Sequence, residues 1–249
     1  MIELLWNDPI SENKMGKYIN SLQLEPHQRV LDVGCGAGEI LIRLAERYQI
    51  TGVGIDTSSD HIAEANKRAK GRVRPSSLTF TVSDAQSFQI APELYDLVIC
   101  MGASHAFGLG KDAYQNALSQ MLPMVVPGGF LLIAEGYMRQ PASQEYRKYL
   151  GDSTPDEMTH AANVATGKML GLIPFAAWTS SKEEWDDFEW TYQRVIERKA
   201  LADPENAGVV QKRNQRRKWM DAYLEWGRDT LGYGIYLFKT SNELESVPT

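Results

Sequence analysis

The sequence predicts an α/β protein with a doubly wound, mostly parallel sheet and a helical cap. Between residues 29 and 137, five short apolar segments of strand-like composition alternate with segments of helical periodicity. Such alternation is typical of βαβ units, whose helices cover both faces of a parallel sheet. A glycine-rich turn follows the first apolar segment, and the next clear period-2 segment begins only at residue 231. The mainly helical sequence between them predicts the cap.

The first predicted βα unit is VLDVGCGAGEILIRLAERY, residues 30–48. The strand, residues 29–33, is apolar and β-rich, and glycines stand at every second position after it, from 34 to 38. The helix is predicted by apolar residues that share one face at helical spacing: Ile40, Leu41, Leu44, Ala45 and Tyr48.

The rest of the predicted core continues this alternation. Further strands are expected at 50–56, 77–84, 95–100 and 127–137, and helices at 58–70 and 112–124. The strand at 127–137 is entered through a Pro-Gly-Gly turn, which punctuates the pattern sharply.

The predicted cap begins after Tyr137. Thr154 and Pro155 resemble the N-cap and first turn of a helix that Gly171 ends. Residues 172–178 are apolar enough for a sixth strand.

The second half of the cap is predicted to be two helices, and the last strand follows it. Ser181 and Glu184 have the spacing of a capping box at the start of a long helix. A further helix is expected near 206–227, and the period-2 segment 231–240 predicts the last strand. We expect the helices to lie over the C-terminal edge of the sheet.

Composition and charge narrow the class of protein. The chain is 43% hydrophobic and 23% charged, as ordinary globular proteins are. A net charge of -6 argues against a nucleic-acid binder. No apolar run approaches the ~20 residues of a membrane span, and the acidic N-terminus does not resemble a signal peptide. Cys35 and Cys100 lack metal-ligand spacing, so we expect a cytoplasmic protein without a metal.

The glycine turn predicts a ligand site. A turn of this kind lets the backbone N–H groups and the start of the helix approach a ligand at the crevice beyond the strands. Dinucleotides and S-adenosylmethionine are both bound in this way. A dinucleotide fingerprint would place glycine or alanine at position 39, which is Glu39 here, and the carboxylate of Asp32 would repel a pyrophosphate. A ligand with an ammonium group and no phosphate fits better.

Three acidic residues close three successive predicted strands. Asp32, Asp56 and Asp84 stand at the ends of the first, second and third strands. A carboxylate at the second strand end is placed for the hydroxyls of a ribose, and one at the third for an adenine amino group. Each residue taken alone is as well explained by a turn or a helix cap. Their coincidence with the glycine turn favours a ligand.

VLDVGCGAGE resembles the nucleotide-binding signature of class I S-adenosylmethionine-dependent methyltransferases. GID, SDA and YDLVIC stand where the later motifs of that family are found, and the resemblance covers residues 29–137. MGASHAFG, AEGYMR and LEWGRDTLGYGIYLF resemble a bacterial subgroup of the family. The resemblance implies a seven-stranded sheet with an antiparallel last strand.

The family's roles can be carried over to matching positions of this chain. The resemblance implies a cofactor site made of the following residues: Asp32, Gly34, Cys35, Gly36, Gly38, Asp56, Thr57, Ser58, Asp84, Ala85, Met101 and Gly102. Asp32 would attract the cofactor's ammonium group, Asp56 would hold its ribose, and Asp84 with Ala85 its adenine. The family commonly folds an N-terminal helix over the cofactor, and residues 10–22, with Lys14, Lys17 and Tyr18, are candidates.

The catalytic candidates follow the fourth and fifth strands. Methyl transfer from a sulfonium needs chiefly alignment, and a general base adds ~10²–10⁴-fold where the acceptor carries a proton. His105 is the first candidate for that base, with Glu135 and Tyr137 as alternates. The competing interpretation is that His105 caps a helix or binds a backbone carbonyl.

The predicted organisation is one domain: an N-terminal helical lid (1–28), a cofactor-binding core (29–137), a substrate cap (138–228) and the last strand (229–240). The leading hypothesis is S-adenosylmethionine-dependent methyl transfer to a small molecule, with no nucleic acid and no membrane as partner. RNA or protein methylation, and cofactor binding without catalysis, are the alternatives. We expect the basic run 212–218 to be a solvated helix face, and the aromatic residues of 178–192 to be cap core, with a cation-accepting pocket as the alternative.

Overall fold

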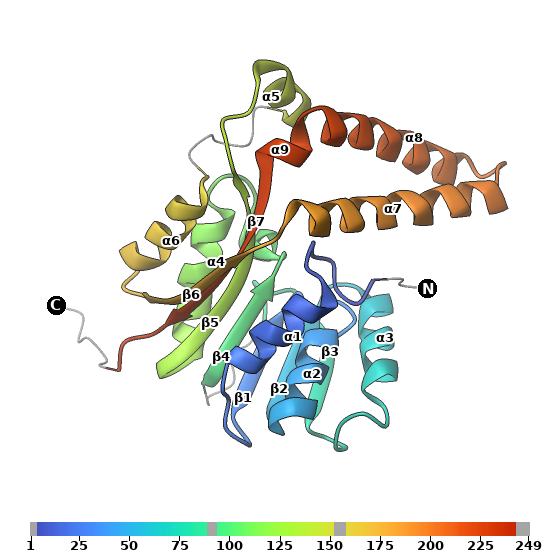
Figure 1. Cartoon of the computed structure of the whole chain (residues 1–249). Coiled ribbons are helices and arrows are strands. Elements are labelled where there is room, and N and C mark those ends of the chain that lie inside the picture. Colours follow the sequence, from blue (N-terminus) through green and yellow to red (C-terminus); the bar gives the residue numbers. More distant parts are fainter. Residues whose placement is uncertain (1–3, 89–93, 152–157, 243–249) are drawn as a thin grey trace.

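The computed structural model describes residues 4–88, 94–151 and 158–242 (Figure 1). Within these ranges one sheet has the strand order β3-β2-β1-β4-β5-β7-β6. Its strands are β1 (Arg29–Val33), β2 (Thr51–Asp56), β3 (Leu78–Val82), β4 (Tyr95–Met101), β5 (Val125–Met138), β6 (Ile173–Thr179) and β7 (Leu231–Lys239). β7 pairs antiparallel with both β5 and β6, and the other pairs are parallel. The predicted fold class is confirmed, including the antiparallel last strand.

Most of the helices lie where the periodicities predicted them, and α5 is an addition that the sequence analysis did not predict. They are α1 (Glu12–Ser21), α2 (Glu39–Tyr48), α3 (Ser59–Ala69), α4 (Ala113–Met121), α5 (Gln144–Leu150), α6 (His160–Met169), α7 (Lys182–Ala202), α8 (Ala207–Ala222) and α9 (Arg228–Thr230). Short 3₁₀ helices span Ser104–Phe107 and Leu122–Met124, and a π-helical turn spans Tyr223–Gly227. The predicted capping box of Ser181 and Glu184 starts α7. None of the described helices is long and apolar enough to cross a bilayer.

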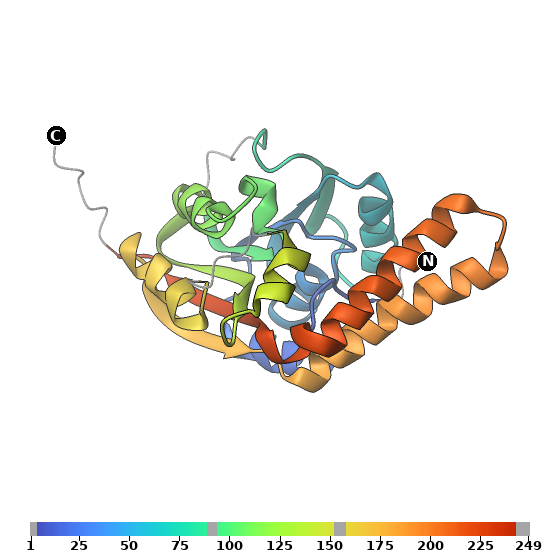
Figure 2. The same ribbon diagram turned by 90° about the horizontal axis from the view of Figure 1, so that it is seen from above.

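Two hydrophobic cores lie on opposite faces of the sheet. Successive strand residues point to opposite faces, so Leu97 and Ile99 of β4 join one core while Val98 and Cys100 join the other. Helices α1, α2 and α3 cover the first face, and α4 and α6 cover the second (Figure 2). Because helices cover both faces, the sheet is doubly wound as predicted.

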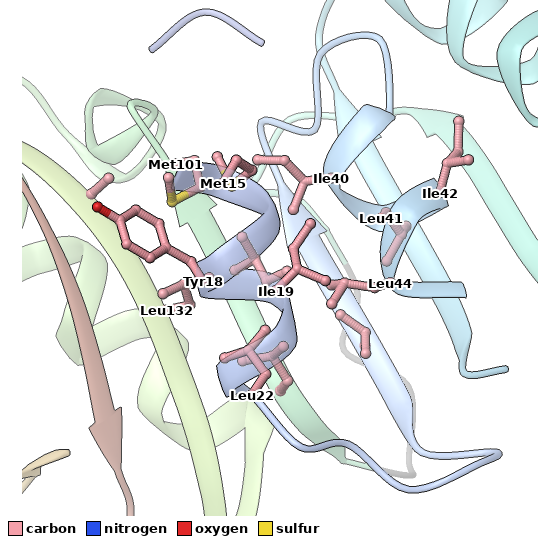
Figure 3. Close-up of a cluster of buried hydrophobic side chains, with 14 of the residues drawn as sticks. Met15, Tyr18, Ile19, Leu22, Ile40, Leu41, Ile42, Leu44, Met101 and Leu132 are labelled. Atoms are coloured by element: carbon pink, nitrogen blue, oxygen red, sulfur yellow. The ribbon is translucent and has the colours of Figure 1, made fainter. Parts of the chain in front are cut away.

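Helix α1 belongs to the first core. Met15, Tyr18, Ile19 and Leu22 are buried there, and Figure 3 shows them pointing toward the strands and α2. The ring of Tyr18 stacks on Trp178 of β6 with ring centroids 4.5 Å apart.

Helices α7 and α8 form a hairpin that projects from the edge of the sheet, on the side of α1, α2 and α3 (Figures 1 and 2). Basic residues of the run 212–218 bind acidic residues of α7. Arg217 donates hydrogen bonds of 2.6 and 2.8 Å to Glu197, and Arg216 pairs with the buried Glu189. Part of the basic run therefore serves the hairpin itself.

In the structure, β5 and α6 do not start at the predicted residues. β5 starts at Val125, two residues before the Pro-Gly-Gly turn, because Val125 already pairs with Tyr95 and the turn forms an irregularity within the strand. The predicted helix start at Thr154 and Pro155 lies outside the described residues. The described helix α6 begins after Thr159, whose hydroxyl accepts the Ala162 N–H.

Candidate functional site

A cavity of about 310 Å³ lies at the edge of the sheet where β1 and β4 end, and we call it the first cavity. Its floor is the glycine turn, Asp32 and Met101. Its other walls are the starts of α2 and α3, the residues Thr191, Tyr192, Val195 and Lys199 of α7, and a segment before α1. That segment, residues 4–11, is called the strap below. Four distant parts of the chain therefore meet around one space.

Two constraints require glycine in this turn: the left-handed backbone conformation and the lack of room for a side chain. Gly34, Gly36 and Gly38 have φ of 72°, 53° and 74°, in the left-handed region that favours glycine. A Cβ at Gly34 would lie 2.4 Å from the Cβ of Ala103, and one at Gly38 would lie 2.6 Å from the Phe80 ring. At Gly36 a Cβ would meet nothing within 4 Å. Gly36 is thus the glycine that leaves open space at the cavity.

The expectation that the turn offers its N–H groups to a ligand needs correction. The N–H groups of Gly34 and Cys35 donate to the Ile55 carbonyl at 2.8 and 2.9 Å. The Gly36 N–H donates to the carboxylate of Asp56 at 3.0 Å. These donors therefore tie the turn to the end of β2. At these three positions the turn therefore contributes space to the cavity rather than hydrogen-bond donors.

Asp32 is the most telling side chain of the first cavity. It is 2% exposed, it lines the cavity, and its carboxylate has no hydrogen bond to any described residue. Burial, together with the charges of Asp8 and Asp56, raises the pKa of Asp32 to about 7. A buried carboxylate without a cation is costly, so the site suits a ligand that brings a positive charge. An ammonium group such as that of S-adenosylmethionine fits this requirement.

Asp56, at the end of β2, accepts the N–H groups of Gly36 and Ser58. Its Oδ1 also lies 3.5 Å from Nδ1 of His61, and His61 lines the first cavity. Because a carboxylate has about four acceptor sites, Asp56 keeps capacity for the hydroxyls of a ribose. The Ser58 hydroxyl caps α3, and Thr57 beside it is exposed.

The other predicted cofactor residues are distributed along the same edge. Cys35 and Met101 line the first cavity, whereas Asp84 and Ala85 lie beyond the end of β3 and outside the cavity lining. Asp84 is exposed and accepts the Gln86 N–H at 2.8 Å, which is the turn interaction that competed with the ligand interpretation. Burial raises the pKa of the Cys35 thiol well above its usual range, so it remains a neutral thiol.

Asp8 of the strap is a component that the sequence pattern did not reveal. It is 5% exposed, it lines the first cavity, and its Oδ1 accepts a hydrogen bond from the Tyr233 hydroxyl of β7. Burial raises its pKa to about 6, against the hydrogen bond from Tyr233, which lowers it. Gly102 lies directly below, where a Cβ would be 2.6 Å from Oδ1 of Asp8. Asp8 could not be predicted as a site residue from the sequence, because it is an isolated aspartate in a segment without helical or strand periodicity.

The strap is held from two sides. The guanidinium of Arg43 lies 5.4 Å from the centre of the Trp6 ring, and Arg68 donates to the carbonyls of Leu4 and Leu5 at 3.4 and 3.3 Å. On the α7 side, the Tyr192 hydroxyl donates to Asn7.

These contacts correct the prediction of the lid. Residues 4–8 line the first cavity, while residues 12–21 form α1, whose buried face packs in the core. Tyr18 is therefore a core residue. Lys14 forms an ion pair of 2.6 Å with Glu184 of α7, and Lys17 is exposed.

The three catalytic candidates lie outside the lining of the first cavity. His105 follows β4 as predicted, whereas Glu135 and Tyr137 lie within the last part of β5, because its pairing with β7 extends that strand to Met138. Burial raises the pKa of Glu135, while Ser104, the Gly136 N–H and the neighbouring His105 lower it. Oε2 of Glu135 is buried without a hydrogen-bond partner in the described structure. The Tyr137 ring instead packs over Gly232 and lies 5.3 Å from the His160 ring. The structure thus brings His105 and Glu135 together and separates Tyr137 from them.

No group of three or more His, Cys, Asp or Glu side chains suited to a metal ion occurs in the described part of the chain. The buried acids at the edge of the sheet are thus not arranged as a metal centre.

Comparison with known proteins agrees with this geometry. Residues 30–129 match the family model described as a methyltransferase domain. The chain is 31% identical over 232 residues to the uncharacterized protein YjhP of Escherichia coli, covering 92% of each chain. It is 30% identical over 136 residues to phosphoethanolamine N-methyltransferase 1 of Triticum aestivum, where the match covers 54% of this chain and 26% of that protein.

Solved structures give the same result over nearly the whole chain. The crystal structure of YjhP matches with a TM-score of 0.86 at 28% identity and covers 95% of both chains. A S-adenosylmethionine-dependent methyltransferase of Geobacter sulfurreducens, solved with S-adenosylhomocysteine, matches with a TM-score of 0.86 at 27% identity, covering 95% of this chain and 94% of that one. Because 95% of this chain is covered, the similarity extends beyond the sheet to most of the hairpin.

Proposed function

Because the chain belongs to the class I S-adenosylmethionine-dependent methyltransferases, we propose that it transfers the methyl group to a small molecule held beneath the α7–α8 hairpin. The enzyme class and the cofactor follow from the family. The nature of the acceptor is the part that is proposed. The observation that supports it is that the strap and α7 cover the first cavity, a space of about 310 Å³, so that an acceptor beside the cofactor has to fit beneath them.

In this proposal the cofactor occupies the first cavity with its ammonium group at Asp32. The open side of Gly36 accommodates the ligand, and Asp56 receives the ribose hydroxyls. Asp84 and Ala85 serve the adenine beyond β3, and the backbone of Met101 and Gly102 approaches the amino-acid end of the ligand. The fit rests on the unpartnered buried carboxylate of Asp32.

The protein's part in the reaction is alignment and exclusion of water. The acceptor atom attacks the methyl carbon while the bond from that carbon to sulfur breaks, and the electron pair remains on sulfur. Holding the two reactants in line can supply up to ~7–11 kcal/mol in favourable models. For an acceptor that carries a proton, we propose His105, supported by Glu135, as the acid–base group.

Two observations favour a small molecule over RNA or protein. The basic side chains Arg216 and Arg217 bind carboxylates of α7, so they are engaged within the hairpin. Relatives at similar identity include a phosphoethanolamine N-methyltransferase and a sterol 24-C-methyltransferase, and both act on small molecules. By analogy, a low-molecular-weight acceptor is expected here.

The test is release of S-adenosylhomocysteine from S-adenosylmethionine in the presence of fractionated acceptors. Incubation with a small-molecule extract of cells should yield the demethylated cofactor, and incubation with RNA or protein fractions should not. Gly36→Ala, in which a methyl group enters the cavity, serves as the inactive control. Turnover confined to the RNA or protein fraction would contradict the proposal. Tight cofactor binding with no turnover in any fraction would favour a binding protein.

A further inference from the structure

A second cavity, of about 220 Å³, lies on the other side of the strap, between the strap and α7. It shares Leu4, Leu5, Trp6, Asp8 and Thr191 with the first cavity. The two spaces therefore adjoin at the strap, and the carboxyl group of Asp8 belongs to the wall of both. A molecule in the second cavity would lie next to a cofactor in the first.

The second cavity is acidic. Asp8, Glu12, Glu184 and Asp187 line it, and no lysine or arginine does so in the described structure. Glu12 and Glu184 are neutralised by ion pairs of 2.6 Å with Arg43 and Lys14.

Two carboxylates remain. Neither Asp8 nor Asp187 has an ion pair with a described residue. Asp8 is 5% exposed and accepts only the neutral Tyr233 hydroxyl, so it is a buried carboxylate that lacks a counter-charge. Asp8, at the wall shared with the first cavity, therefore lacks one positive charge, and the exposed Asp187 adds a second negative charge to the lining of the second cavity.

Aromatic rings complete the lining. Trp6 and Phe188 face the second cavity from the strap and from α7. The Trp6 ring is fixed because its indole N–H donates to the Ile10 carbonyl at 2.8 Å. Phe188 packs against Tyr192, with ring centroids 5.1 Å apart. Carboxylates combined with fixed aromatic rings are the usual means by which proteins hold organic ammonium groups.

We propose that the second cavity holds the methyl acceptor and that this acceptor is an organic amine whose nitrogen lies at Asp8, between the rings of Trp6 and Phe188. The inference rests on the proposed function. In the step, the nitrogen lone pair forms the bond to the methyl carbon, the carbon–sulfur bond breaks with its electron pair on sulfur, and the positive charge passes from sulfur to nitrogen. The carboxylate of Asp8 stabilises that charge as it develops.

The negative charge of the second cavity disfavours hydroxyl and thiol acceptors. A hydroxyl or thiol must lose its proton to become a strong nucleophile, and nearby carboxylates oppose the formation of a second anion. An amine loses its proton to solvent before it reacts, attacks through the lone pair of the neutral base, and regains a positive charge on nitrogen that the carboxylates favour. Between these acceptor classes, the charges of the cavity therefore select nitrogen.

Calorimetry with a matched pair of probes tests the inference on protein saturated with S-adenosylhomocysteine. Choline carries a quaternary ammonium, and 3,3-dimethylbutan-1-ol has the same shape without the charge. Choline should bind at least tenfold more tightly. Asp8→Asn should remove that preference while leaving the affinity for the alcohol within twofold, and Asp187→Asn, an exposed change that keeps the fold, should reduce it severalfold. Asp112→Asn, a change of the exposed N-cap residue of α4, far from the strap in the sequence, is the control and should change neither affinity.

The outcomes separate this inference from the proposed function. Equal binding of the two probes, or a preference that survives both Asp8→Asn and Asp187→Asn, would overturn the amine site and leave the methyltransferase assignment intact. Failure of S-adenosylhomocysteine to bind in the same calorimeter would instead count against the cofactor site. A second readout is methyl transfer: 2-(dimethylamino)ethanol should be methylated and 3,3-dimethylbutan-1-ol should not.

Discussion

Tyr233 on β7 donates a hydrogen bond to Asp8 on the strap, across a separation of 225 residues. The contact lies over Gly102, where a Cβ would be 2.6 Å from Oδ1 of Asp8 and 3.0 Å from the Tyr233 hydroxyl. Only glycine leaves this space, and its φ of 61° also requires it. The first and last parts of the described chain are therefore joined at the tip of β4, and that junction brings a carboxylate to the cavity.

Gly36 should be necessary for cofactor binding rather than for folding. A methyl group there meets no protein atom within 4 Å, so Gly36→Ala should cost only about 1 kcal/mol of stability for the left-handed backbone. We expect it to weaken S-adenosylhomocysteine binding at least tenfold, measured by calorimetry. Gly71→Ala is the matched control, because Gly71 has a φ of 79° and equally open space but does not line the cavity. Equal binding by both variants would contradict the placement of the ligand.

Asp32→Asn should weaken the binding of S-adenosylhomocysteine and increase the stability of the fold. Burial raises the pKa of Asp32 to about 7, so its stabilising contribution is present below pH 3.8 and is lost as the pH rises through 7. At pH 8 the variant without this charge should be more stable by about 2–4 kcal/mol, since each pKa unit is worth ~1.4 kcal/mol. Its affinity for S-adenosylhomocysteine should fall roughly 10–100-fold through loss of a charge-assisted hydrogen bond. Chemical denaturation and calorimetry measure the two effects, and a variant that binds normally would exclude the ammonium contact.

Cofactor binding should be linked to proton release. An ammonium group prefers the ionised carboxylate, and burial raises the pKa of Asp32 to about 7 and of Asp8 to about 6. Affinity for S-adenosylhomocysteine should therefore rise between pH 5.5 and 7.5, by up to about tenfold per pH unit for one linked proton. Calorimetry in phosphate and Bis-Tris buffers, which differ in ionisation enthalpy, should show different apparent enthalpies at pH 6.5. A pH-independent affinity, with equal enthalpies, would mean that both carboxyl groups are already ionised in the free protein.

His105 should affect turnover and not cofactor affinity. Its side chain is exposed and lies outside the first cavity, and its electrostatic effect lowers the pKa of Glu135. If it accepts the acceptor's proton, His105→Ala should lower kcat by ~10²–10⁴-fold and leave the Kd of S-adenosylhomocysteine unchanged. Tyr137→Phe, on the His160 side of the sheet, is expected to change kcat less than threefold. An unaltered kcat in His105→Ala would leave this residue with only a structural role in its loop.

The fold was largely predictable because each signal is local. Apolar runs such as 29–33 and 95–100 became buried strands, and Ser181 with Glu184 became the capping box of α7. The predicted and observed boundaries differ by one to a few residues where pairing with a neighbouring strand extends an element. Pairing with Tyr95 of β4, for example, makes β5 start at Val125. The basic run of α8 was predicted as a helix face, but its pairing with Glu189 and Glu197 depends on the hairpin.

The sequence by itself determined the strand and helix order, the glycine turn and the acids at the strand ends, because turn conformation and periodicity are properties of neighbouring residues. Tertiary structure alone decided that Asp32 is unpartnered, that Asp8 lies beside it under Tyr233, and that Trp6 and Phe188 face one cavity. These relationships join residues far apart in the chain. Burial and the summed field of neighbouring charges exist only once those residues are packed together, so no local pattern records them.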